Sequence, residues 1–289
     1  VWLLFACASA LFAGLTAVLA KQGVRTTDST LATALRTPVV LLGAWGMTLL
    51  SGSVHETGQV GARSLVYLVL SGLATGASWL CYFKALQLGD VSKVAPVDKM
   101  STVLTVIMAV LLLGEGLSAL GAVGLALVTV GTLLMLRAED LRSLPRALAG
   151  GGGWLLYALG AALFAALTAI LGKIGIAAVP SDLGTAIRTG IVLVMAWVMV
   201  GVAGRLGSAT RVPRGEMIWI LLSGAATCAS WLCYFRALQD GPASVVVPID
   251  KLSVLVSVAF SVLVLREHVG VRALLGLAML VVGTVALAL

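Results

Sequence analysis

The string Ser-Trp-Leu-Cys-Tyr-Phe occurs twice in this chain, at residues 78–83 and again at residues 230–235. The two copies are 152 residues apart, and the same offset relates Pro96-Val97-Asp98-Lys99 to Pro248-Ile249-Asp250-Lys251. Further identities at this offset run along the whole chain and include the pairs Lys21/Lys173, Arg36/Arg188 and Glu115/Glu267. The chain is therefore an internal duplication whose halves align without a net gap, and the fold must be built from two copies of one unit.

The composition places both copies in a membrane. The chain is 60% hydrophobic and only 11% charged, whereas a soluble domain carries about 25% charged residues. Its outer surface must therefore face lipid. The formal charge of +7 comes mostly from short connections, where Lys and Arg set orientation and contact lipid headgroups, so it does not indicate nucleic-acid binding.

Continuous apolar runs predict the helices. A helix needs about 20 apolar residues to cross the hydrocarbon core, and unbroken runs exclude the alternating pattern of membrane strands. Ten runs can be placed, at about 1–20, 29–51, 64–86, 93–113, 117–136, 153–173, 181–203, 216–238, 245–265 and 269–289. The sequence thus predicts an all-α membrane protein with ten transmembrane helices. A five-helix repeat at 1–140 is joined by a linker at 141–152 to a second repeat at 153–289.

The odd number of spans in each repeat predicts that the second repeat enters the membrane from the opposite side. The repeats are then inverted and related by a pseudo-two-fold axis in the membrane plane. Positive charge is enriched in the first, fifth, seventh and ninth connections, which all lie on one face. By the positive-inside rule that face is cytoplasmic, and both termini are expected outside.

The repeated motifs resemble the EamA domain of the drug/metabolite transporter superfamily. The resemblance rests on the Trp-containing third helix, the Pro in the fourth and the Glu that ends it, in both halves. It is strongest to short bacterial members with one EamA domain, here present as a fused pair. It implies ten helices, a central cavity lined by both repeats, alternating access and residence in a bacterial inner membrane. Members are usually described with cytoplasmic termini, which differs from the orientation expected from the charges of this chain.

The repeated arginines are the first candidates for function. Arg36 and Arg188 lie about two turns, or roughly 10 Å, inside their helices, where a charge costs at least about 2.5–3.5 kcal/mol. Each could line a cavity and bind a carboxylate or phosphate, or pair with an acid during the cycle. The alternatives are a buried arginine satisfied by carbonyls or by an aspartate, and one that reaches a headgroup.

The two Pro-x-Asp-Lys motifs are the second candidates. A proline removes a backbone hydrogen bond and can break a helix beside a site. Asp98 and Asp250 could couple transport to protons, with Lys99 and Lys251 contributing to substrate binding. Alternatively, these residues open a helix and complement its dipole. Adjacent residues point about 100° apart on a helix, so at most one of each pair is expected to face a cavity.

Aromatic and acidic residues complete the candidates. Trp79 and Tyr82 share a helix face, as do Trp231 and Tyr234, and either face could contact an organic substrate or belong to an interfacial aromatic belt. Glu115 and Glu267 end the fourth helices, where they could act as gates or form ordinary helix-end ion pairs. Residues 72–76 and the glycines Gly121, Gly124 and Gly131 predict close helix-packing faces.

These observations predict a secondary active transporter, with a small molecule, the lipid bilayer and protons as partners. Two Arg, two Lys and two Asp in the repeated positions leave a net charge of +2. This favours an anionic or zwitterionic solute such as an amino acid or organic phosphate, exported by alternating access. The alternatives are proton-coupled efflux of cationic drug-like compounds, a passive channel, and an enzyme for which the sequence offers no catalytic motif. No cofactor and no nucleic acid are expected, and the protein is expected to be a monomer or homodimer.

Overall fold

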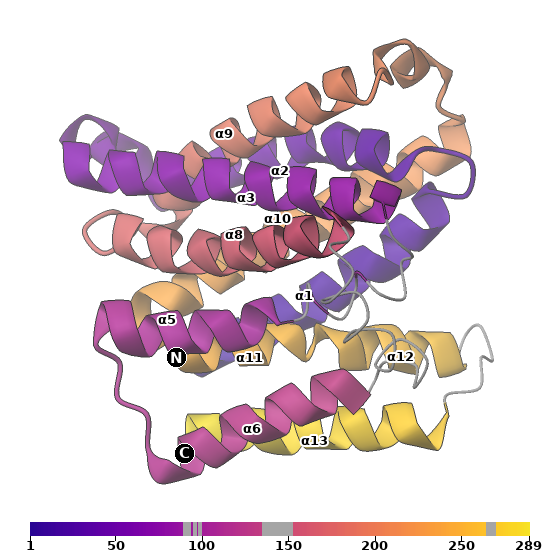
Figure 1. Cartoon of the computed structure of the whole chain (residues 1–289). Helices are drawn as coiled ribbons and strands as arrows, with labels where there is room; N and C mark the ends of the chain where they lie inside the picture. Colours follow the sequence, from indigo (N-terminus) through magenta and orange to yellow (C-terminus); the bar gives the residue numbers. More distant parts are fainter. Residues whose placement is uncertain (89–93, 95–96, 98–99, 135–152, 264–269) are drawn as a thin grey trace.

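The computed structural model describes the chain except residues 89–93, 95–96, 98–99, 135–152 and 264–269, and regular structure in the described part is helical throughout (Figure 1). The first repeat contains α1 (Trp2–Gly23), α2 (Ser29–Ser51), α3 (Ala62–Leu88), α5 (Ser101–Leu113) and α6 (Ala119–Leu134). The second contains α8 (Gly153–Gly175), α9 (Ser181–Val202), α10 (Arg214–Asp240), α11 (Ala243–Lys251), α12 (Ser253–Leu263) and α13 (Val271–Ala288). Short 3₁₀ helices at Ser53–Gln59 and Leu206–Arg211 precede α3 and α10. The bounds repeat at an offset of about 152 residues, which confirms the duplication.

Eight helical segments are long and apolar enough to cross a membrane, counting α11 and the start of α12 as one. The apolar helices α5 and α6 are shorter over the described residues and lie where the fourth and fifth spans are predicted. The all-α membrane architecture is therefore confirmed, while the count of ten spans stays a prediction. Both termini lie at the same end of the bundle (Figure 1), as an even number of crossings requires.

The repeats pack on each other with pseudo-two-fold symmetry. Helix α1 packs on α10 and α3 packs on α8, while α2 contacts α9 and α6 contacts α13. If the two repeats are exchanged, the α1–α10 contact becomes the α8–α3 contact, and the α2–α9 and α6–α13 contacts are unchanged. The core is therefore made by pairing one half with the other, and neither half encloses it alone.

Glycines set the separation of α6 and α13. A Cβ atom added at Gly124 would lie 2.6 Å from the carbonyl oxygen of Gly283, and one added at Gly131 would lie 2.6 Å from that of Gly276. The reciprocal contact, from Gly283 to the Gly124 oxygen, is also 2.6 Å. In a membrane such close backbone approach supplies packing that lipid-facing apolar side chains cannot. The predicted packing role of Gly124 and Gly131 is confirmed.

The fourth helix is interrupted at matching positions in the two repeats. The Leu252 amide donates to the Ile249 oxygen at 2.9 Å and the Met100 amide donates to the Val97 oxygen at 3.1 Å. Both bonds span three residues, where a regular α-helix spans four. Pro248 lies one turn before the break and has no amide hydrogen to donate. The helix of the second repeat is therefore interrupted directly after Asp250 and Lys251, as the Pro-x-Asp-Lys motif predicts.

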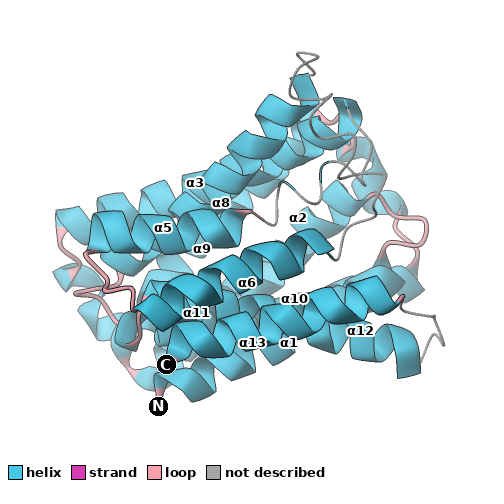
Figure 2. Ribbon diagram, turned by 60° about the horizontal axis from the view of Figure 1, so that its bottom comes forward, coloured by secondary structure: helices cyan, strands magenta, loops and turns pink. Residues whose placement is uncertain are grey.

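The two ends of the bundle differ in how tightly they pack. We call the end that carries both termini the terminal end and the opposite one the far end. The largest buried cluster lies toward the terminal end and includes Leu68, Ile170 and Phe235. At the far end, a cavity of about 740 Å³ lies among the start of α2, the end of α3, the start of α8 and the end of α9. Figure 2 shows the helices converging toward the termini and diverging at the far end.

Candidate functional site

A central cavity of about 270 Å³ lies where the two repeats meet. Its walls come from α1, α3, α8, α9, α10 and the broken helix α11, and include Thr75, Trp79, Arg188, Trp231, Tyr234, Phe235, Asp250 and Lys251. Six of the residues that the sequence singles out or repeats thus meet in one place: Trp79, Arg188, Trp231, Tyr234, Asp250 and Lys251. Such a cavity is slightly smaller than the roughly 300–1,000 Å³ of typical drug-sized sites, so it suits a small metabolite.

Arg188 is the dominant charge of this cavity. Its side chain is 1% exposed, and its guanidinium lies 4.9 Å from the ring centroid of Trp231 and 4.5 Å from that of Phe235. One terminal nitrogen donates to the hydroxyl of Thr75 at 2.8 Å. The Nε and the other terminal nitrogen are buried without a hydrogen-bond partner among the described residues. Two donors of a buried cation are therefore available at the cavity.

The position of Arg188 follows from the crossing of α9 and α3. A Cβ atom on Gly72 would lie 3.0 Å from the Arg188 carbonyl oxygen and 2.7 Å from the Cβ of Ile191. Only glycine allows α3 to approach α9 this closely. Thr75 lies one turn further along α3, and the close crossing brings its hydroxyl within reach of the guanidinium.

Asp250 and Lys251 both line the cavity, although the sequence predicts that at most one of the pair does so. Both residues belong to the last turn of α11, which ends at Lys251, and α12 begins at Ser253. A separation of about 100° around the helix therefore does not keep the second side chain away from the cavity wall. Ser9 of α1 donates to Asp250 at 2.5 Å, and the two serines Ser9 and Ser230 lie 3.4 Å apart. A carboxylate of one repeat is thus held by the first helix of the other.

The aromatic residues separate into two environments. Trp79, Trp231 and Tyr234 line the central cavity. Tyr82, the counterpart of Tyr234, packs instead on a hydrophobic cluster that contains Val97 and Trp154, so its role in substrate binding stays a prediction. Phe235 and Thr75 also contact Arg188. Phe235 completes the repeated aromatic face Trp231, Tyr234 and Phe235, while Thr75 was not predicted as a site residue, although it recurs at the offset of 152 residues as Thr227.

Arg36 occupies a different place from Arg188. It lines a separate cavity of about 350 Å³ with Lys21, Thr33 and Ser223, between α1, α2 and α10. No hydrogen bond or ion pair joins Arg36 to a described residue, while Arg188 donates to Thr75. The sequence treats the two arginines as equivalent, but the structure gives them different surroundings.

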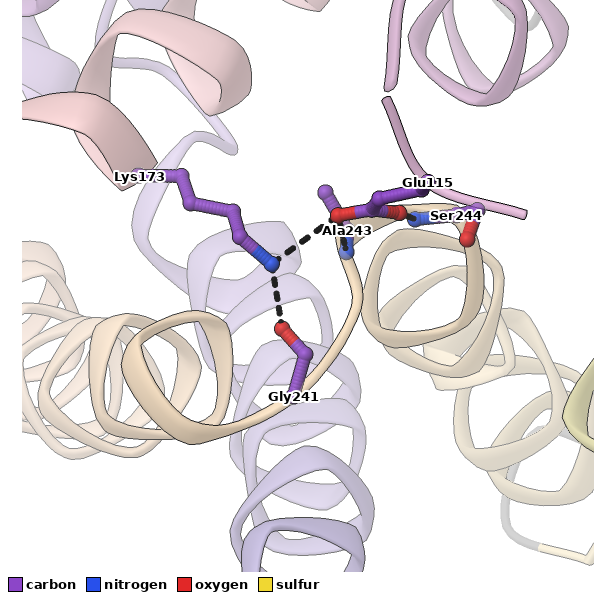
Figure 3. A network of polar contacts seen from close by, with 5 residues as sticks. All are labelled: Glu115, Lys173, Gly241, Ala243 and Ser244. Carbon is purple, nitrogen blue, oxygen red and sulfur yellow. Dashed lines mark hydrogen bonds and ion pairs between the residues drawn. The ribbon is translucent and has the colours of Figure 1, made fainter. Parts of the chain in front are cut away.

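Glu115 closes the terminal end of the bundle (Figure 3). Its carboxylate accepts from Lys173 at 2.9 Å and from the backbone amides of Ala243 and Ser244 at 2.7 and 2.8 Å, which open α11. Lys173 also donates to the Gly241 oxygen at 2.5 Å. We call these five residues the Glu115 cluster. It joins the fourth helices of both repeats to the end of α8.

The charge of Glu115 is favoured by these contacts. Burial by itself would raise the pKa of Glu115, but the hydrogen bonds from Ser244, Ala243 and Lys173 outweigh burial and hold the pKa below its ordinary value. The carboxylate is therefore ionised at neutral pH and suits the positive end of the α11 dipole. Its repeat counterpart Glu267 lies outside the described residues, as do Asp98 and Lys99.

The cavity combines a guanidinium, an ammonium and a carboxylate with aromatic walls. A guanidinium with free donors binds carboxylates and phosphates in bidentate geometry. Asp250 could accept from the ammonium of a zwitterion or exchange a proton. This arrangement can bind and release a small charged organic molecule inside the membrane.

Comparisons with known proteins agree with this geometry. The model of the EamA-like transporter family matches residues 1–137 and 152–289. A Sinorhizobium sp protein named "Uncharacterized transporter in cobO 3'region" is 46% identical over 134 residues, which cover 46% of this chain and 95% of that protein. A solved structure described as "Crystal structure of protein" is similar with a TM-score of 0.73 and 18% identity, over 98% of this chain and 94% of the other. At that identity the likeness shows the fold alone. The family matches each half separately, and the Sinorhizobium relative is about the length of one repeat.

Proposed function

The chain belongs to the EamA-like transporter family, and from this premise we propose that it is a secondary active transporter of small anionic or zwitterionic organic solutes. Amino acids and organic phosphates are the solute classes that fit best, and a bacterial inner membrane is the proposed location. The transport cycle is alternating access, in which the central cavity opens in turn to each face of the membrane.

The observation that carries this proposal is the pair of buried, unpartnered donors on Arg188. A buried donor without a partner costs about 1–3 kcal/mol, and more when it belongs to a charged group. This cost in the empty protein is offset in the bound state when a ligand accepts hydrogen bonds from the donors. Oxygens of a carboxylate or phosphate on the solute could accept from Nε and from the free terminal nitrogen, which lie on different edges of the planar guanidinium.

Asp250 supports coupling to protons. The carboxylate lies in the same cavity as Arg188 and Lys251 and accepts from Ser9. A titratable acid at a site deep in a membrane protein commonly marks a proton pathway. If Asp250 must take up a proton in one state and release it in the other, the proton gradient drives the solute.

A cationic drug-like substrate is the second candidate. The Trp79, Trp231 and Tyr234 rings could stack on a flat cation while Asp250 neutralises it. Arg188 and Lys251 argue against this alternative, because the three charged side chains of the cavity sum to +1 with Asp250 ionised.

Electrophysiology on a solid-supported membrane tests the proposal. Proteoliposomes of the full chain would be exposed to a panel of amino acids, glycerol phosphate, inorganic phosphate and cationic dyes. We expect saturable currents from an anionic or zwitterionic solute, and their loss in Arg188→Lys, which keeps the charge but not the bidentate fork. Currents from organic cations alone would refute the proposed solute class. Retention of pH-driven accumulation in Asp250→Asn would refute coupling through that residue.

A further inference from the structure

Every side chain that contacts the Arg188 guanidinium has an identical counterpart in the other repeat. Thr75, Trp231 and Phe235 correspond to Thr227, Trp79 and Phe83 at the offset of 152 residues. Such identity does not extend to every neighbouring position, since Ser9, which donates to Asp250, corresponds to Ala161. The chain therefore carries the parts for a second arginine pocket around Arg36.

The backbone frame of that second pocket is already in place. A Cβ atom on Gly224 would lie 2.9 Å from the Arg36 carbonyl oxygen, just as one on Gly72 would lie 3.0 Å from that of Arg188. Helices α2 and α10 thus cross as α9 and α3 do. Thr227 lies one turn beyond Gly224, in the position from which Thr75 binds Arg188.

The second pocket is nevertheless not assembled. Arg36 lines a cavity of its own, is partly rather than fully buried, and has no hydrogen bond to a described residue. Trp79 packs near Leu31 and Trp197, and Phe83 lines the large cavity at the far end. In contrast, Phe235 is 1% exposed. The two repeats therefore hold the same residues in two different arrangements.

We propose that the two arrangements exchange during transport, so that Arg36 becomes the buried anion-binding arginine when the terminal end opens. In that state its guanidinium donates to Thr227, stacks on Trp79 and Phe83, and offers its remaining donors to the solute. Arg188 then faces an open cavity. The inference rests on the proposed function, because it names the solute-binding group of the second state.

One residue difference between the repeats sets which arrangement is preferred. Phe235 lies against α8 at Gly172, where an added Cβ would be 2.6 Å from its ring and 3.2 Å from the Ser71 hydroxyl. The counterpart of Gly172 is Ala20, whose methyl group would meet Phe83 if the far end closed in the same way. The terminal end therefore closes more tightly, and the Glu115 cluster adds to that preference.

Exchanging these two small residues provides the test. In the double variant Ala20→Gly/Gly172→Ala, the added methyl group opposes closure at the terminal end. The removed methyl group makes closure easier at the far end, and no polar group is changed. Phenylglyoxal, a water-soluble reagent that modifies arginine, would be applied to the full chain in lipid nanodiscs without solute. Mass spectrometry would then quantify modification of Arg36 and Arg188 separately. Gly190→Ala is the matched control, because a Cβ atom there meets nothing within 4 Å.

We expect Arg36 to react and Arg188 to be protected in the wild type and in Gly190→Ala. The double variant should raise the ratio of Arg188 to Arg36 modification by about fivefold or more, from the usual cost of overpacking. Adding Thr227→Val should restore the reactivity of Arg36. Glu115→Gln provides a second, independent way to open the terminal end and should change the ratio in the same direction.

More modification of Arg188 without less modification of Arg36 would refute the proposed exchange. An unchanged ratio of Arg188 to Arg36 modification in both the double variant and Glu115→Gln would refute it as well. Because no solute is used, this result is independent of the electrophysiology. Currents from cations alone would refute the solute class and leave the exchange measurable. Anion currents with an unchanged ratio would refute only the exchange.

Discussion

Replacing Arg188 by methionine should separate stability from transport. The arginine is fully buried, and its favourable contacts are one charge-assisted hydrogen bond to Thr75 and stacking on two aromatic rings. The hydrogen bond is worth about 1.5–3 kcal/mol and the stacking about 2 kcal/mol. Against them stand the desolvation of a buried ion, several kcal/mol in effect, and two unpartnered donors at about 1–3 kcal/mol each.

The balance predicts that Arg188→Met stabilises the empty protein by about 1–3 kcal/mol, within the range seen when buried ions are replaced by apolar residues of similar volume. Thr75 is not left unsatisfied, because its hydroxyl also donates to the Ser71 oxygen at 3.0 Å. At about 2–4 °C per kcal/mol for a chain of this size, the unfolding midpoint should rise by several degrees. The same variant should lose the currents evoked by anionic or zwitterionic solutes.

Thermal unfolding of the purified protein, followed by tryptophan fluorescence, measures the first effect, and proteoliposome currents measure the second. A solute that binds the native state should raise the midpoint of the wild type and not that of Arg188→Met. Arg36→Met is the comparison variant and should change stability less than Arg188→Met, since Arg36 is only partly buried. If Arg188→Met is less stable than the wild type and keeps its currents, Arg188 has a structural role, and the proposed role in solute binding is wrong.

Three further predictions address the framework around the cavity. Gly124→Leu should destabilise the protein by about 1–3 kcal/mol or more in thermal unfolding, because its Cβ would lie 2.6 Å from a carbonyl oxygen of α13. The control Gly46→Ala should be neutral or slightly stabilising, because a Cβ atom there meets nothing within 4 Å. The lowered pKa of Glu115 means that its stabilising effect is present above the ordinary value of 4.5 and is lost as pH falls through the folded-state pKa. Unfolding midpoints across pH 6 to about 3 should therefore fall less steeply in Glu115→Gln than in the wild type, and parallel curves would contradict this. Glu216→Gln should speed hydrogen exchange at the Thr26 and Thr27 amides, which now donate to the Glu216 carboxylate at 3.1 and 2.9 Å, while leaving exchange in α6 unchanged.

Residue pattern alone identified the charged residues of the central cavity and the Trp and Tyr residues of its walls. Trp79, Arg188, Trp231, Tyr234, Asp250 and Lys251 were all singled out because each is costly or distinctive inside an apolar run and recurs at one offset. Phe235 belongs to the repeated aromatic face, whereas Thr75 recurs as regularly but is unremarkable in a membrane helix, so repetition alone did not mark it as a site residue. Ser9 gave no signal, because its counterpart is an alanine and its contact with Asp250 joins residues far apart in the chain.

The break in the fourth helix was predicted, but its consequence for side-chain direction was not. Pro248 indicates an interruption, and Asp250 and Lys251 lie in the last turn of α11, just before α12 begins. Helix α11 packs against α5 and α12 packs against α1, so both neighbours belong to the other repeat. A local propensity therefore located the break, while the cavity wall that contains both side chains is formed together with helices of the other repeat.

The sequence by itself determined the membrane environment, the duplication, the helices and the class of residue that could carry function. These follow from hydropathy and repetition, which are properties of the chain taken one segment at a time. The tertiary structure was needed to show that Arg188 is fully buried while Arg36 is partly buried, and that the terminal end is held by the Glu115 cluster. The physical reason is that matching residues of the two repeats meet different neighbours once the repeats pack on each other. Which half adopts which packing depends on contacts between the halves, such as Gly172 with Phe235, that no single segment contains.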